Sequence, residues 1–242
     1  IVLSGGGCVV TLENPHLDIA ELFDTIEANR VNTIAIVGDA FAKPMLRALD
    51  AEPERWDLSS LIVIASSGVM FSESSKAGLI RHLPQVMIVD AFSSSEAIGM
   101  GQSVTAAGVD AGTAKFSLGA NTKVFTDDHR EVVPGSGEIG KVAVGGYQPI
   151  GYYKDPDKTA ATFLTVDGKR YSVPGDFATV EADGSITLLG RGSVCINTGG
   201  EKVFPEEVEE VLVDHPAVAD ILVVGTPDER WGSAVTAVVE PA

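Results

Sequence analysis

Apolar runs and amphipathic segments alternate along roughly the first hundred residues. Three runs are apolar almost throughout and predict buried strands, at residues 33–37, 61–65 and 86–89. Segments that start at Asp18, follow Gly38 and cover residues 73–82 repeat apolar side chains at helical spacing, and Asp18 suits a helix N-cap. Such strands, alternating with such helices, predict an α/β fold with a parallel sheet that helices cover on both faces.

The pattern changes after about Gly108. Short β-like runs are separated by Asp-Asp, Pro-Gly, Gly-Gly and Asp-Gly turns, at residues 122–125, 139–144 and 185–189. They predict a small β-barrel-like subdomain, interrupted by one short helix that begins near Asp155 and Pro156. Beyond Arg191, a helix from Pro205 and strands at 218–224 and 234–239 predict an α+β tail.

Composition is that of a globular protein, with 45% apolar and 21% charged residues. No apolar run reaches the roughly 18 residues of a membrane span, so no transmembrane segment is predicted. The net charge of −17 argues against nucleic acid as a partner, because phosphate backbones are bound by clustered Lys and Arg. Cys8 and Cys195 lie far apart without ligand spacing, and we expect them to be reduced, as in a cytoplasmic protein.

The beginning of the chain is an apolar, glycine-rich stretch. It starts at Ile1 without a Met and without the basic start of a signal peptide, so we expect it to be the middle of a longer protein. The run from Ser4 to Gly7 is followed by no Lys-Ser or Lys-Thr, and it predicts a plain turn rather than a phosphate loop.

Small and polar residues follow the second and third predicted strands, at 66–72 and 90–96. Ligands of parallel sheets bind beyond the carboxyl ends of the strands. Gly68 would let backbone approach a flat ligand closely, the serine hydroxyls could bind a phosphate, and Glu96 could hold Mg²⁺. Taken singly, each segment is more typical of a solvated loop.

Two charged residues lie among glycine turns further along the chain. Asp176 follows Pro-Gly and could be only a turn former, and Arg191 could be only a surface ion-pair partner. The glutamates that follow Pro205 are interpreted as stabilising the N-terminus of a helix. The four histidines have no partners at diagnostic spacing and receive no role.

Four sets of residues, in order, resemble motifs of the adenylate-forming superfamily, which comprises acyl-CoA synthetases, amino-acid-adenylating domains and luciferases. Residues 67–72 look like its Gly-Gly-Ala-Pro-Leu turn, and 92–96 (Phe-Ser-Ser-Ser-Glu) are similar to its Tyr-Gly-x-Thr-Glu segment. Residues 151–156 match Gly-Tyr-x-x-Asp-Pro, while 171–176 and 190–209 match the ribose-binding and interdomain segments. The Ser-Ser-Glu and Val-Pro-Gly-Asp forms look most like bacterial, especially actinobacterial, fatty-acid–CoA ligases.

The resemblance implies an ATP-dependent ligase that joins a fatty or other carboxylic acid to CoA through an acyl-adenylate, with Mg²⁺ as cofactor. It implies catalytic roles for Ser95, on the α-phosphate, and for Glu96, on the metal ion. Asp176 would take both ribose hydroxyls, and Arg191 would reinforce the ribose or phosphate side. Phe92 would stack on adenine, opposite backbone around Gly68 and Val69. The remaining expected contacts are Met70, Asp90 and Ala91 with the nucleotide, and Gly199 and Gly200 by the pantetheine tunnel.

The resemblance also implies a domain organisation. Residues 1–108 would be the C-terminal half of the large α/β nucleotide-binding domain, 109–190 a β subdomain, and 191–242 the truncated start of a C-terminal lid. The family's phosphate loop would precede Ile1 and its distal lysine would follow Ala242, so we expect the fragment to be inactive alone. Val194 stands where many members have a hinge Asp, and Phe92 replaces a Tyr.

Two alternatives stay open at this point. One is an acyl-AMP ligase that loads a carrier protein instead of CoA. The other is a non-catalytic relative that binds AMP or acyl-AMP. Acyl chain length and oligomeric state are not predicted.

Overall fold

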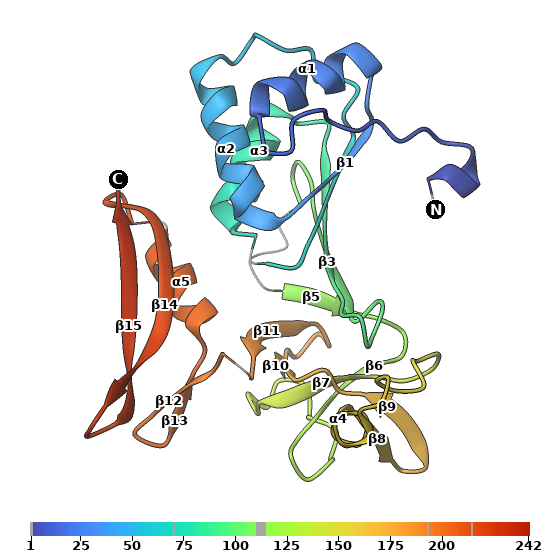
Figure 1. Ribbon diagram of the computed structural model, residues 1–242, viewed down its shortest axis with the longest axis vertical. Helices are drawn as coiled ribbons and strands as arrows, with labels where there is room; N and C mark the ends of the chain where they lie inside the picture. Colours follow the sequence, from blue (N-terminus) through green and yellow to red (C-terminus); the bar gives the residue numbers. More distant parts are fainter. Residues whose placement is uncertain (1, 70, 110–114, 193, 214) are drawn as a thin grey trace. The chain divides into compact units, whose positions relative to one another are not determined.

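The computed structural model describes residues 2–69, 71–109, 115–192, 194–213 and 215–242 (Figure 1). The chain divides into two compact units. The first comprises Ile1–Ala91 and Ser103–Thr113, and the second comprises Phe92–Gln102 and Ala114–Ala242.

The first unit is built on three parallel strands in sequential order. Thr33 lies opposite Val63, and Val63 lies opposite Met87. Its elements along the chain are η1 (Leu3–Gly5), α1 (Ile19–Asn29), β1 (Thr33–Ile36), α2 (Gly38–Ala51), β2 (Val63–Ser67), α3 (Glu73–His82) and β3 (Met87–Phe92). The three helices and the parallel sheet are those predicted, and Asp18 caps α1 by accepting the N–H groups of Ala20 and Glu21.

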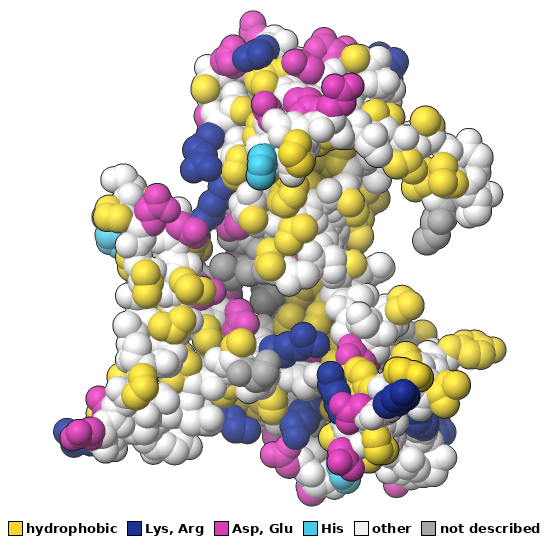
Figure 2. Space-filling model, viewed as in Figure 1, with side chains coloured by type: hydrophobic (Ala, Val, Ile, Leu, Met, Phe, Trp, Pro, Cys, Tyr) yellow, Lys and Arg dark blue, Asp and Glu magenta, His cyan; other side chains and the backbone are white. Residues whose placement is uncertain are grey.

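Helices cover one face of these strands. Ile34, Ile64 and Ile88 point into a core shared with side chains of α1, α2 and α3. Both crossovers move in the same direction along the sheet, and right-handed crossovers then place both helices on the same side. Among the described residues no helix covers the other side, where Ala35, Ile62 and Met87 are exposed, and Figure 2 shows apolar side chains on the surface of this unit.

The second unit is antiparallel. Its strands run in the order β5-β11-β10-β7-β9-β8, with β6 also paired to β7, and the first two residues of β4, Gly101 and Gln102, pair with β5. The bounds are β4 (Gly101–Thr105), β5 (Lys115–Leu118), β6 (Thr122–Phe125), β7 (Gly140–Val144), α4 (Pro156–Thr162), β8 (Phe163–Val166), β9 (Lys169–Ser172), β10 (Asp176–Val180) and β11 (Ile186–Arg191). Val142, Ala178 and Ile186 lie at the centre of its core, each fully buried. The predicted β region and its capped helix are both present.

The C-terminal part of the second unit consists of two hairpins and a helix. Its elements are β12 (Ile196–Thr198), β13 (Glu201–Val203), α5 (Pro205–Val213), β14 (Val218–Asp228) and β15 (Gly232–Pro241). Glu209 on α5 accepts the Val223 N–H at 2.7 Å and ties the helix to β14. The last two strands are longer than predicted, because Pro227 stays in register opposite Ser233 instead of ending β14. Across the described part of the chain, no helix has the length and apolarity to cross a bilayer.

Candidate functional site

Asp176 and Arg191 face each other across two antiparallel strands. Asp176 is the first residue of β10 and Arg191 is the last of β11, and the ladder pairs them directly. Arg191 Nε lies 3.5 Å from Asp176 Oδ1. The arginine side chain is half exposed while that of Asp176 is 12% exposed, so the pair lies at the surface with its acid turned inward.

The Asp176 carboxylate is only partly satisfied. Its Oδ2 atom is buried and has no hydrogen-bond partner among the described residues. Burial raises the pKa of Asp176 above its ordinary value, Arg191 opposes that effect, and the charge of Glu96 adds to it. A buried acceptor without a donor is costly, which is typical of a group whose partner is a ligand.

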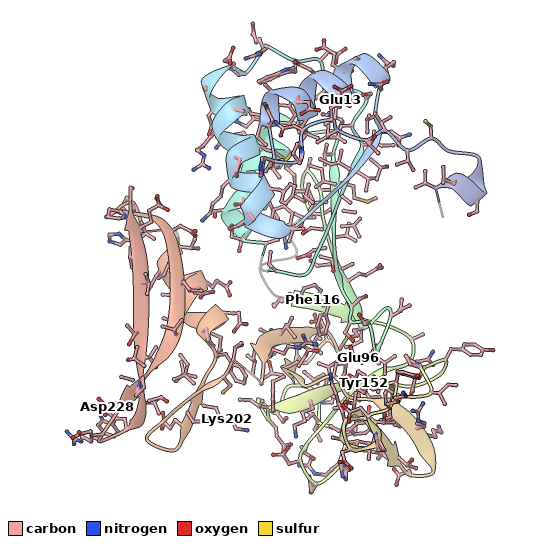
Figure 3. The ribbon with its side chains drawn as sticks, in the orientation of Figure 1. Glu13, Glu96, Phe116, Tyr152, Lys202 and Asp228 are labelled. Atoms are coloured by element: carbon pink, nitrogen blue, oxygen red, sulfur yellow. The ribbon has the colours of Figure 1, made fainter. Side chains whose placement is uncertain are left out.

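Glu96 is held by a residue 56 positions away in the sequence. The Tyr152 hydroxyl donates to Glu96 Oε1, and the two side chains are labelled side by side in Figure 3. This bond is the main reason that the pKa of Glu96 lies below its ordinary value, and Arg191 contributes in the same direction. Glu96, Asp176 and Arg191 thus influence one another electrostatically, although they come from three separate segments.

Glu206 is a further carboxylate beside this group. It is the second residue of α5, and its Oε2 atom is buried without a partner in the described chain. Burial is the main cause of its raised pKa, and Asp176 is among the acids that raise it further. A Cβ built on Gly190 would lie 2.5 Å from Glu206 Oε2, and Gly190 has a φ of +132°. Both the contact with Glu206 and the backbone conformation therefore require glycine at this position.

Gly190→Ala is expected to destabilise the chain by about 1–3 kcal/mol, because the new methyl group would overlap the Glu206 carboxylate and strain the backbone. Gly184→Ala is the matched control, since Gly184 also has positive φ (+83°) but nothing within 4 Å of its Cβ position. Urea unfolding of both variants measures the difference. Equal losses of stability would show that Glu206 does not crowd Gly190.

The other predicted residues of the second unit lie at the ends of strands and in turns. The ring of Phe92 packs at 5.6 Å on that of Phe116 and is partly buried. Ser95 is exposed in the segment that leads to Glu96. Gly199 and Gly200 form the turn between β12 and β13, both with positive φ, and the Gly199 N–H donates to the carbonyl of Trp231.

The remaining predicted residues belong to the first unit. Gly68 has a φ of +98° in the turn after β2, next to Val69, which is exposed. The carbonyl of Ala91 accepts a hydrogen bond from the Ser67 hydroxyl at 2.7 Å. Met70 lies outside the described residues.

Asp90 points into the first unit, where its Oδ2 atom lies 3.4 Å from Lys76 Nζ. Both side chains are more than 90% buried. Burial raises the pKa of Asp90, and Lys76 partly offsets the shift. The side chain therefore contributes to the interior of this unit, and its predicted contact with the nucleotide stays a prediction.

Three side chains that contact or adjoin the predicted acids, Tyr152, Glu206 and Lys76, were not identified from the sequence. Tyr152 was placed in a motif but received no role, although that motif could have identified it. Glu206 was interpreted only as a helix-terminus charge, and Lys76 was not singled out on the face of α3.

Within the described part of the chain, no three His, Cys, Asp or Glu side chains gather closely enough to hold a metal ion. An open depression of about 710 Å³ lies in the first unit, between residues 10–15 and α1.

Comparisons with known proteins agree with these features. Residues 207–242 match the family model described as AMP-binding enzyme C-terminal domain. A medium/long-chain-fatty-acid–CoA/3-oxocholest-4-en-26-oate–CoA ligase of Mycolicibacterium smegmatis is 47% identical over all of this chain, which covers 44% of that protein. A 3-oxocholest-4-en-26-oate–CoA ligase of Rhodococcus rhodochrous is 48% identical over 98% of this chain and 43% of that protein.

The fold of the chain is also similar to that of a known protein. The solved structure of the amide bond synthetase McbA from Marinactinospora thermotolerans is similar with a TM-score of 0.79 and 25% identity, over 99% of this chain and 47% of that one. The chain spans less than half the length of the curated relatives it matches. Residues 207–242 thus match the AMP-binding enzyme C-terminal domain family, and the chain as a whole is similar in sequence to these CoA ligases and in fold to this synthetase.

Proposed function

We propose that the protein carrying this chain is an ATP-dependent fatty-acid–CoA ligase. The buried, unpartnered Oδ2 atom of Asp176, beside Arg191 and Glu96, is the observation that carries the proposal. A carboxylate accepts hydrogen bonds without donating any, which suits the two neighbouring hydroxyls of a ribose. The names of the M. smegmatis and R. rhodochrous relatives support the reaction class and point to medium-chain, long-chain and steroid carboxylic acids.

The reaction has two steps. The substrate carboxylate attacks the α-phosphorus of ATP, and pyrophosphate leaves. The CoA thiol then loses its proton, attacks the acyl carbon and displaces AMP. Negative charge grows on the phosphate oxygens during the first step, so preplaced donors and cations lower its barrier.

This chain would supply part of that machinery. Asp176 would hold the ribose, Arg191 would stabilise charge beside it, and the exposed hydroxyl of Ser95 would donate to the α-phosphate. Mg²⁺ is usually bound by one or two carboxylates together with substrate phosphates, so the single carboxylate of Glu96 fits that role. When bound, the ion would neutralise phosphate charge. The roles of Gly68, Val69, Met70, Asp90, Ala91, Phe92, Gly199 and Gly200 stay predictions.

The domain assignment is also a proposal. We assign residues 1–108 to a nucleotide-binding domain, 109–190 to a β subdomain and 191–242 to the start of a lid, which the family match at 207–242 supports. A cytoplasmic location stays a prediction. The 242 residues alone should release no pyrophosphate from ATP and fatty acid, and clear turnover would contradict the expected dependence on further segments.

The observations support the adenylation step more strongly than they support CoA as the molecule that accepts the acyl group in the second step. The similar McbA structure is that of an amide bond synthetase, so this fold accommodates acceptors other than a thiol. A chain of the relatives' length should be tested with a panel of carboxylic acids and with CoA, a phosphopantetheinyl carrier protein and an amine. We expect acyl-CoA as the product. A thioester formed only on the carrier would indicate an acyl-AMP ligase, and AMP binding without turnover would indicate a non-catalytic relative.

A further inference from the structure

The hydroxyl of Tyr152 is a neutral donor to the carboxylate of Glu96. A lysine or arginine in that place would cancel the charge of the carboxylate, whereas a phenol orients it and leaves its charge intact. A carboxylate has about four lone-pair sites, so one bond from Tyr152 leaves capacity for another ligand.

Tyr152 is itself fixed by the loop and helix that follow it. Its N–H donates to Thr159 Oγ1 at 2.9 Å, and the Thr159 hydroxyl donates to the Asp155 carbonyl at 2.7 Å. Asp155 in turn caps α4 by accepting the Lys158 N–H. A Cβ on Gly151 would lie 2.5 Å from Thr159 Cγ2, so this close packing depends on the glycine.

The ring of Tyr152 is held from two directions. Lys158 Nζ lies 4.1 Å from its centroid, and the ring of Phe163 packs 6.0 Å away. Neither contact involves the hydroxyl, so the ring would keep its position without it. A side chain held in this way presents its hydroxyl at a fixed point and loses little further freedom when a ligand binds.

We infer that Tyr152 is a positioning residue, which holds the Glu96 carboxylate oriented for the divalent cation that accompanies a nucleotide phosphate. The inference rests on the proposed function for the identity of the cation's partner, but the contact itself does not. Residues that orient a metal ligand typically contribute ten- to a hundredfold to metal affinity. Because Tyr152 is one of several influences on Glu96, we expect an effect of about tenfold, at the lower end of that range.

The test uses Tyr152→Phe in a chain of the relatives' length, with Tyr153→Phe as the matched control. Tyr153 is the next residue, is 88% exposed and has its own lysine, Lys154, over its ring at 5.2 Å. Carboxyl NMR gives the pKa of Glu96 without any ligand. Calorimetry gives Mg²⁺ affinity in the presence of a non-hydrolysable ATP analogue, and thermal melting reports whether the fold is kept.

Tyr152→Phe should raise the Glu96 pKa and weaken Mg²⁺ binding by about tenfold, while affinity for metal-free AMP and the melting temperature stay unchanged. Tyr153→Phe should alter none of these. An unchanged Glu96 pKa in Tyr152→Phe would show that the Tyr152 hydroxyl does not donate a hydrogen bond to Glu96. A raised pKa with unchanged Mg²⁺ affinity would overturn the positioning role. Failure of the proposed function is distinct, since it would appear as wild-type protein that makes no acyl-adenylate from any acid.

Discussion

Asp176→Ala should weaken binding of ATP and AMP by about a hundredfold or more in a chain of the relatives' length. Hydrogen bonds to a charged group contribute about 1.5–3 kcal/mol each, and the two ribose hydroxyls would both lose their acceptor. Arg191 cannot replace it, because a guanidinium only donates. Isothermal titration calorimetry with each nucleotide measures the loss.

The same change should not destabilise the protein without nucleotide. The pKa of Asp176 is raised in the fold, so its ionised form opposes folding above that raised pKa, and the penalty disappears below the ordinary value of 3.8. Removing the carboxylate removes this penalty, and half-exposed Arg191 loses little with its partner. At neutral pH, Asp176→Ala should therefore be as stable as wild type or more stable, as measured by thermal unfolding.

Asp157→Ala is the control for this pair of measurements. Asp157 is an exposed acid in the first turn of α4, in the same unit, and its loss changes net charge equally. Asp157→Ala should change nucleotide affinity by less than about twofold, because the charge of an exposed side chain is screened by salt. Similar affinities for wild type and a folded Asp176→Ala would contradict the ribose role.

Lys76→Met should cost about 3–5 kcal/mol of stability, the largest effect we expect in the first unit. The change leaves the Asp90 carboxylate buried without its cation, and breaking one side of a buried pair is strongly destabilising. Urea unfolding can be followed through Trp56, which packs on Phe23 in this unit. A Trp231→Phe background removes the tryptophan of the second unit from the signal.

Two further variants separate the loss of the ion pair from the effect of removing any cation from this unit. Arg47→Met removes an exposed cation from α2 in the same unit and should change stability by less than about 0.5 kcal/mol. Lys76→Met combined with Asp90→Val replaces both charges with apolar groups and should recover most of the loss. If the free energy of unfolding of Lys76→Met lay within about 1 kcal/mol of the wild-type value, the Asp90 carboxylate would not depend on Lys76 as its partner.

Local chemistry made much of the fold predictable from the sequence. The helix at 73–82 was predicted with the bounds it has, since Ser72 is a strong N-cap and a basic turn ends the helix. Asp155 and Pro156 likewise mark the start of α4. Apolar runs located the strands but not their burial, because a run alone does not show which face the helices will cover.

The candidate site was predictable only in its individual residues. Asp176 and Arg191 were singled out as a pair, but their direct opposition follows from the register of β10 and β11, which depends on side-chain packing along both strands. The bond from Tyr152 to Glu96 joins residues 56 positions apart. No local pattern specifies such a contact, and only the packing of α4 and its loop brings the hydroxyl to the acid.

Fatty-acid-dependent release of pyrophosphate from ATP is the decisive measurement for the proposed ligase activity and for the ribose-binding role of Asp176. It should be measured on a chain of the relatives' length, for wild type and for Asp176→Ala, with folding of both checked by thermal melting. Medium- or long-chain acids should stimulate release by wild type, and Asp176→Ala should lose this release at nucleotide concentrations that saturate wild type. Folded wild type that releases no pyrophosphate with any acid, or an Asp176→Ala protein as active as wild type, would contradict this prediction.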